Sequence, residues 1–174
     1  MVAYYPTGKK AEGNSKVVFV TTLVDPADIL VSEVTGGLDV SNFIKGGAWQ
    51  PSADQAKGED RRHGSKDTYE QLGRIKRTIA DLVYVADPQA APADADNEAY
   101  ETFKAGVTGW FLHRVGLDVD TAAAATQKWD AYPIEFGAQV KTPVAEDDEF
   151  AVITVTQAVA VTGRIFEDVP LALT

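Results

Sequence analysis

Short runs of apolar and β-branched residues, separated by turn signals, recur along the chain and favour β-strands over long helices. Residues 16–22 are apolar on both faces and predict a strand that is covered on both sides. Asp25-Pro26 and Gly36-Gly37 are turn signals, and residues 28–34 between them fit either a short helix or a second strand. Further strands are predicted over residues 38–44, 68–87, 108–117, 131–141 and 150–162.

The strand predicted over residues 131–141 has the clearest alternation of apolar and polar positions. Its core face is predicted to hold Tyr132, Ile134, Phe136, Ala138 and Val140. The other face carries Glu135 and Gln139, which must then face water or another subunit. Asp81, in the long run that precedes Asp87, is a second acid that an open surface would expose.

One helix and one long loop interrupt the strand pattern. Residues 98–104 predict a short helix that is capped by Asp96 or Asn97 and ended by Gly106. Residues 45–67 are polar and show no sustained period, which predicts a long loop that is functional or is ordered by a partner. About six to eight strands and one clear helix predict a mainly β fold, either a sandwich or a barrel.

The length fits a single domain, because 174 residues, of which 45% are apolar, suffice for one hydrophobic core. The first 15 residues show no periodicity and predict a flexible arm before a domain over residues 16–174. No apolar run approaches the roughly 20 residues that span a bilayer, and the N-terminus lacks the features of a signal peptide. We therefore expect no membrane insertion and a protein that stays in the cytoplasm where it is made.

Charge and composition narrow the classes of function. The 26 acidic and 16 basic residues give a net charge of −10, which disfavours a groove that grips nucleic acid. The chain has no Cys, which excludes disulfides and thiol nucleophiles. Gly58 and Gly64-Ser65-Lys66 have the wrong spacing and order for a phosphate-binding loop, and Asp118-Val119-Asp120 lacks the Gly and Glu of a calcium loop. His63 and His113 lack the context of a triad, so no catalytic, cofactor or metal site is predicted.

Basic residues concentrate between residues 57 and 77, which hold seven Lys or Arg, whereas residues 78–103 hold six acids and no base. A solvated loop and electrostatic pairing between copies of the chain explain this contrast equally well. The acidic run Glu146-Asp147-Asp148-Glu149 is interpreted as a solvated turn that leads into the strand predicted over residues 150–162.

Several segments, taken in their order along the chain, carry a family resemblance. The first are Leu38-Asp39-Val40-Ser41-Asn42-Phe43-Ile44, Trp49-Gln50-Pro51-Ser52-Ala53-Asp54-Gln55, Glu59-Asp60-Arg61-Arg62 and Thr68-Tyr69-Glu70-Gln71-Leu72-Gly73-Arg74. The later ones are Asn97-Glu98-Ala99-Tyr100-Glu101, Arg114-Val115-Gly116-Leu117-Asp118 and Val159-Ala160-Val161-Thr162-Gly163. Over about residues 16–170 the chain resembles the major tail tube proteins of long-tailed, siphovirus-type bacteriophages that infect actinobacteria.

The resemblance implies a tail-tube fold, with two packed antiparallel β-sheets (sandwich- or barrel-like), one short flanking α-helix and a long loop. It also implies that six copies form a ring by joining their inner sheets, and that rings stack into a hollow tube in the virion tail. The implied partners are other copies of the chain, the tape measure protein, the tail terminator and the distal tail protein. DNA is expected to pass through without specific binding, no cofactor is implied, and the tail assembles in the host cytoplasm.

The resemblance places residues 45–67 where a long loop contacts the neighbouring ring. The residues implied in contacts between subunits or rings are Trp49, Asp54, Glu59, Asp60, Arg61, Arg62 and Lys66. We expect this loop to be disordered in the monomer, and we expect Arg61 and Arg62 to pair with carboxylates of a neighbour. The candidates for the lumen wall are Asp81, Glu135 and Gln139.

Two other classes of function remain open at this point. The chain also fits a small monomeric β-barrel module that binds a ligand or a peptide, which tube formation by the purified protein would exclude. An enzyme ranks below both, since only an acid cluster such as Asp118 and Asp120 offers material for catalysis.

Overall fold

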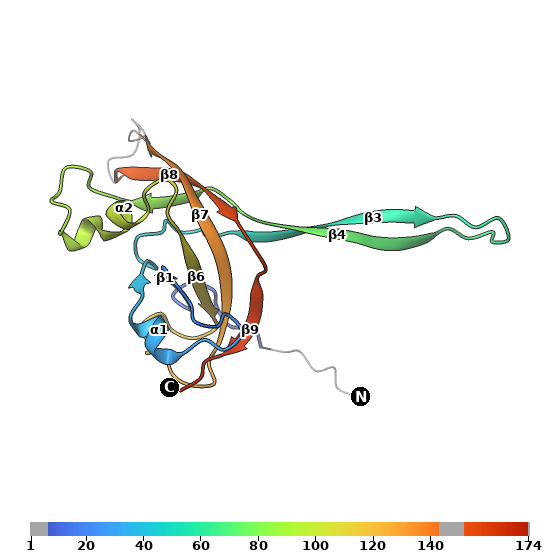
Figure 1. The fold of residues 1–174 in the computed structure, drawn as a ribbon, viewed down its shortest axis with the longest axis horizontal. Coiled ribbons are helices and arrows are strands. Elements are labelled where there is room, and N and C mark those ends of the chain that lie inside the picture. Colours follow the sequence, from blue (N-terminus) through green and yellow to red (C-terminus); the bar gives the residue numbers. More distant parts are fainter. Residues whose placement is uncertain (1–6, 143–151, 174) are drawn as a thin grey trace.

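The computed structural model describes residues 7–142 and 152–173, so the acidic turn predicted at residues 146–149 lies outside the described part of the chain. Figure 1 shows a rounded body, built around a curled sheet, from which a long two-stranded arm projects. The described chain is mainly β and contains only short helices, as the pattern of the sequence predicts.

Two sheets organise the described residues. The strands are β1 (Ser15–Val20), β2 (Leu38–Asp39), β3 (Pro51–Asp60), β4 (Tyr69–Ile79), β5 (Leu82–Val85), β6 (Thr108–Val115), β7 (Lys128–Thr142), β8 (Thr154–Val161) and β9 (Phe166–Pro170). The helices are α1 (Val31–Thr35) and α2 (Glu98–Thr102), and a 3-10 turn over Ala95–Asn97 leads into α2. Seven strands form the body sheet in the order β2-β1-β6-β7-β8-β5, with β9 paired to β7, while β3 and β4 form the arm.

One face of the body sheet carries a cluster of aromatic rings. Phe19 of β1, Phe111 of β6 and Phe136 of β7 are at most 2% exposed, and their ring centroids lie 5.5–5.7 Å apart. Phe103, which follows α2, stacks on Phe136 at 4.3 Å between centroids. Burial of these rings stabilises the body and holds α2 against the sheet.

A second apolar cluster lies on the opposite face of β1 and β6. Its members are Val18, Val20, Ile29, Val34, Leu112, Trp129, Ala131, Val169 and Leu171. They come from the sheet, from α1 and from the C-terminal segment, which is tied down because Ala172 exchanges backbone hydrogen bonds with Ile29 and Val31. β1 is therefore covered on both sides, which confirms the prediction made from residues 16–22.

A buried amide links α2 to the sheet. Gln157 of β8 is 1% exposed, and its Nε2 donates to the carbonyls of Phe103 (2.6 Å) and Gly137 (2.8 Å). Its Oε1 accepts from the Tyr84 hydroxyl at 3.0 Å. Burial raises the pKa of Tyr84 to about 12, so the hydroxyl keeps its proton and remains a donor. All three hydrogen bonds are needed, because an unpaired buried polar group is costly.

The structure corrects three boundaries that were predicted from the sequence. Residues 51–60, predicted as part of a loop without regular structure, form β3 because their backbone pairs with β4. Both faces of β3 stay largely exposed and polar, so no apolar period marks this strand in the sequence. The strand predicted over residues 68–87 is two strands, β4 and β5, and the one predicted over residues 38–44 ends at Asp39.

A register shift in β7 reverses part of the pattern predicted for residues 131–141. Phe136 pairs with Val159, whereas Gln139 pairs with Gln157, so β7 contains one extra residue between them. Beyond this bulge Gln139 turns toward Tyr84, whereas Ala138 and Val140, which were predicted on the core face, are exposed, Val140 to 60%. The prediction for Val140 is wrong because one inserted residue moves every later side chain to the other face.

Candidate functional site

The arm consists of β3, β4 and the turn over residues 61–68, and Figure 1 shows it extending away from the body. Its strands of 10 and 11 residues correspond to a length of roughly 35 Å at 3.4 Å per residue. At its base Ile79 is buried and Arg77 forms an ion pair with Glu167 of β9. The Arg77 hydrogen bond lowers the pKa of Glu167, so this pair anchors the arm at neutral pH.

One face of the arm carries exposed apolar side chains, because the two strands pair with a shift in register. Ile75 lies opposite Gln55, and Leu72 lies opposite Lys57, so β4 contains one extra residue between these pairs. Without this bulge Leu72 and Ile75 would point to opposite faces, since they are three positions apart. They share a face instead, 67% and 52% exposed, and we call this surface the apolar arm face.

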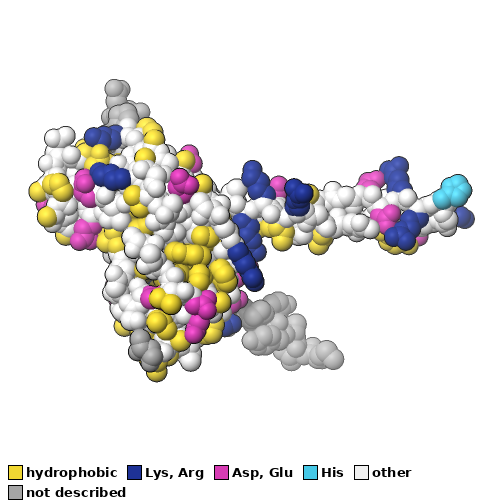
Figure 2. Space-filling model, viewed as in Figure 1, with side chains coloured by type: hydrophobic (Ala, Val, Ile, Leu, Met, Phe, Trp, Pro, Cys, Tyr) yellow, Lys and Arg dark blue, Asp and Glu magenta, His cyan; other side chains and the backbone are white. Residues whose placement is uncertain are grey.

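Charged side chains surround the apolar arm face. Figure 2 shows Lys and Arg side chains along the arm and hydrophobic side chains along one side of it. At the tip Arg61 and Arg62 pair with Glu59 and Asp60, each at 2.9 Å. These pairs lie within one subunit and are mostly exposed, so each contributes little to stability. The prediction that Arg61 and Arg62 bind a neighbour stays a prediction.

The remaining residues that were predicted in the contact loop lie partly on the arm and partly in the body. Asp54 and Lys66 lie exposed on the arm, and Asp54 is opposite Lys76 in the β3–β4 register. Trp49 lies before the arm and packs into the body instead, with its ring centroid 5.1 Å from that of Phe111 and 5.5 Å from that of Tyr132. The structure therefore does not bring Trp49 together with the charged residues of the arm.

Of the three candidates for the lumen wall, two are exposed and one points into the subunit. Glu135 is exposed on β7, between Thr108 of β6 and Ala160 of β8, so it projects from a face of small side chains. Asp81 is exposed in the turn between β4 and β5. Gln139 points into the subunit.

Hydrogen bonds within the subunit hold the Gln139 side chain. Its Nε2 donates to the Tyr84 hydroxyl oxygen at 2.9 Å and to the Tyr100 carbonyl at 2.8 Å. Gln139 therefore supports α2 and the buried Gln157 network, whereas Glu135 and Asp81 remain free to face another molecule.

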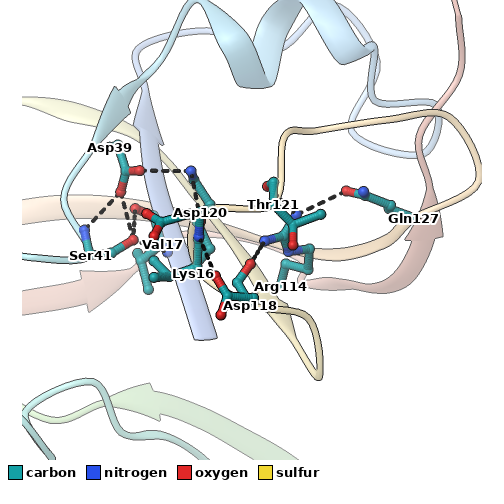
Figure 3. A network of polar contacts seen from close by, with 10 residues as sticks. Lys16, Val17, Asp39, Ser41, Arg114, Asp118, Asp120, Thr121 and Gln127 are labelled. Atoms are coloured by element: carbon teal, nitrogen blue, oxygen red, sulfur yellow. Dashed lines mark hydrogen bonds and ion pairs between the residues drawn. The ribbon is translucent and has the colours of Figure 1, made fainter. Parts of the chain in front are cut away.

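Figure 3 shows a polar network that the sequence analysis did not single out. Arg114 of β6 is 1% exposed and donates to the carbonyls of Asp118 (2.7 Å) and Thr121 (3.0 Å) and to Oε1 of Gln127 (3.1 Å). Burial lowers the pKa of Arg114, and no carboxylate of a described residue accepts a hydrogen bond from its guanidinium. This buried cation fixes the loop between β6 and β7, and a charge within an otherwise apolar strand was its only sequence signal.

The acids considered for catalysis belong to this loop. The Asp118 carboxylate accepts a hydrogen bond from the backbone N–H of Asp120 at 3.0 Å, which closes a turn. In the same network Lys16 pairs with Asp39 at 2.9 Å and donates to the Val119 carbonyl at 3.1 Å (Figure 3). These contacts connect β1, β2 and the loop.

Other titratable groups give no arrangement with catalytic or metal-binding geometry. His113 Nε2 lies 3.0 Å from Ser15 Oγ, but no carboxylate of a described residue hydrogen-bonds to this imidazole. Burial lowers the pKa of His113. Within residues 7–142 and 152–173, no three His, Asp or Glu side chains gather closely enough to hold a metal ion. In the same part of the chain, no helix has the length and apolar character needed to cross a membrane.

Comparison with known protein families identifies the family of this chain. The family model for the phage tail tube protein matches residues 2–173, which is nearly the whole chain. No curated protein matches the sequence. The match agrees with the resemblance carried by the segments between residues 38 and 163 and with the mainly β body. The chain therefore belongs to the phage tail tube protein family, and it is a structural component of the virion tail.

Proposed function

We propose that this chain is the major tail tube subunit of a long-tailed phage, and that six copies form each ring of a hollow, stacked tube through which DNA is ejected. The arm is the observation that carries this proposal. A two-stranded hairpin is at best marginally stable alone in water, and this one exposes Leu72 and Ile75 on a single face. Such a surface is suited to contact with another copy of the chain.

The arm also provides a head-to-tail mode of contact. It projects from one side of the body (Figure 1), and we place its receptor on the body of a second copy, a surface different from the arm itself. A contact between two different surfaces propagates into a filament when it does not close on itself. Stacked rings fit this requirement, with the arm between rings and the edges of the body sheets paired within each ring.

The charge of the chain suits a conduit for DNA. Six copies carry six times −10, or −60, per ring. Glu135 projects from the small-residue face of β7 and β8, and Asp81 is exposed near the arm's base. We place both in the lumen wall, where they repel phosphates over the roughly 8 Å that charges act at physiological salt. We do not place Gln139 in the lumen wall, because hydrogen bonds hold its side chain inside the subunit.

The remaining features follow from this role. The tape measure protein occupies the lumen before DNA does, the tail terminator and the distal tail protein close the two ends, and assembly occurs in the host cytoplasm. The subunit requires no catalytic group and no cofactor for this function.

The test is electron microscopy of concentrated purified protein in negative stain. The wild type is expected to form hollow tubes with a regular ring repeat and six-fold symmetry in end views. A variant in which residues 53–77 are replaced by a short Gly-Asn turn keeps Ile79 and the body, so it should unfold cooperatively but form no tubes. Normal tubes from this variant, or a wild type that remains monomeric at every concentration, would contradict the proposal.

A further inference from the structure

A groove on the body has the chemistry to receive the arm of a second copy. It has a volume of about 510 Å³ and lies between β5, the segment before β3 and the residues that lead into β8. Its apolar wall is formed by Phe43, Val85, Ala86, Val152 and Ile153. Val152 and Ile153 are 45% and 46% exposed, so the groove offers apolar surface that the described residues leave open. We call it the β5–β8 groove.

The ionisable groups that line the β5–β8 groove are both acids. Asp87 and Asp96 lie at its edge, both are exposed, and neither forms an ion pair with a described residue. They belong to residues 78–103, the stretch with six acids and no base. The β5–β8 groove therefore combines an apolar wall with negative charge at its rim.

The arm has the complementary combination. Leu72 and Ile75 lie opposite residues two positions apart on β3, so their side chains emerge about 7 Å from each other. Lys57 lies directly opposite Leu72 and therefore shares this face, and its ion pair with Glu70, at 3.6 Å, is exposed. Residues 57–77 carry seven basic and four acidic side chains, a net charge of +3.

Other grooves of the body fit the arm less well. The groove beside β1 and β6 is bordered by Lys9 and Lys10, which repel a basic arm. The groove beside β9 is lined by Ile75 and Arg77, so it includes the base of the same subunit's arm, and Arg77 is already paired with Glu167. Charge and apolar surface together favour the β5–β8 groove as the docking site for the arm of a second copy.

We propose that the apolar arm face of one copy docks into the β5–β8 groove of a second copy, with Leu72 and Ile75 on its apolar wall and Lys57 facing Asp87 and Asp96. This contact rests on the proposed function, since it is the step that joins one subunit to the next in the tube. Burial of the apolar side chains supplies affinity, and the charges at the rim select the register.

Cysteine cross-linking tests the contact directly, because the chain has no Cys of its own. The variant Leu72→Cys/Val152→Cys places one thiol on the arm and one in the groove. When its tubes are oxidised with diamide, non-reducing gels should show a ladder of covalently linked subunits. The matched control Leu72→Cys/Val115→Cys carries the second thiol in the groove bordered by Lys9 and Lys10, at a residue that is 63% exposed, and should give no ladder.

A charge-reversal series provides an independent measurement that does not depend on cysteine variants. Asp87→Lys should raise the critical concentration for tube formation about tenfold at low salt. Lys57→Glu in the same chain should restore assembly, and Asp28→Lys, at an exposed acid that does not line the groove, should leave it unchanged. Thermal unfolding of each variant confirms that the body is folded.

The outcomes separate this contact from the proposed function. A ladder from the Val115 control, or tubes that give no ladder in either variant, would overturn the docking site while leaving the tube intact. Unchanged assembly of Asp87→Lys would do the same. A wild type that forms no tubes would overturn the proposed function, and the docking site with it.

Discussion

Substitutions on the apolar arm face test directly whether the arm contacts another subunit in the tube. Replacing Leu72 and Ile75 by Ser should hardly change the stability of the free subunit, since both side chains are more than half exposed there. Substitutions at such positions usually change the free energy of unfolding by no more than about 0.5 kcal/mol. The same change should weaken assembly strongly, because assembly removes these side chains from water.

The magnitude follows from the exposed fractions. Full burial of a Leu or Ile side chain is worth about 1.5–3 kcal/mol, and Leu72 and Ile75 are 67% and 52% exposed in the subunit. About 1–2 kcal/mol per side chain therefore remains to be gained on assembly, or about 2–4 kcal/mol for both. Since about 1.4 kcal/mol corresponds to a factor of ten, the critical concentration should rise between roughly 30-fold and several hundred-fold.

Pelleting of tubes over a concentration series measures the critical concentration, and thermal unfolding measures the subunit. The control is Val24→Ser, because Val24 is 89% exposed in a loop of the body and carries no role in the proposed contact. If the double variant assembles at the wild-type concentration with an unchanged melting temperature, the arm face is not buried in the tube and the reasoning fails.

Four further predictions follow from other parts of the structure. Gln157→Leu leaves buried polar groups unpaired and should cost about 3 kcal/mol, a fall of roughly 6–12 °C in melting temperature by calorimetry. Arg61→Glu/Arg62→Glu should weaken tube assembly most at low salt, and equal pelleting at low salt would favour a solvated tip. Glu135→Lys in phage should leave tails assembled but slow DNA ejection, whereas a tube structure with residue 135 on the outer surface would refute the assignment. Because burial lowers the pKa of His113 from 6.5, the unfolded chain binds more protons, so stability should fall as the pH drops below 6.5, and His113→Gln should flatten that part of the curve.

Several features of this protein were determined by the sequence alone. The apolar runs predicted a mainly β chain, the two-sided pattern of residues 16–22 predicted a strand covered on both faces, and the segment after Asn97 predicted α2, although the Asn97 side chain makes no capping hydrogen bond. The order of the family-like segments between residues 38 and 163 indicated the tail tube family. Such features are visible because burial imposes an apolar period locally, and because a family retains its residues in order.

Tertiary structure alone decided the features that bear on assembly. Pairing with β4 makes residues 51–60 a strand although its side chains are polar, since the backbone forms the ladder and no core imposes a period. Single-residue bulges decide that Leu72 shares a face with Ile75 and that Gln139 turns inward, because register depends on the partner strand. Arg114 likewise becomes a buried anchor only when a distant loop folds over it. These pairings cannot be predicted from the local sequence, because the hydrogen-bond partner of each backbone or side-chain group lies elsewhere in the chain.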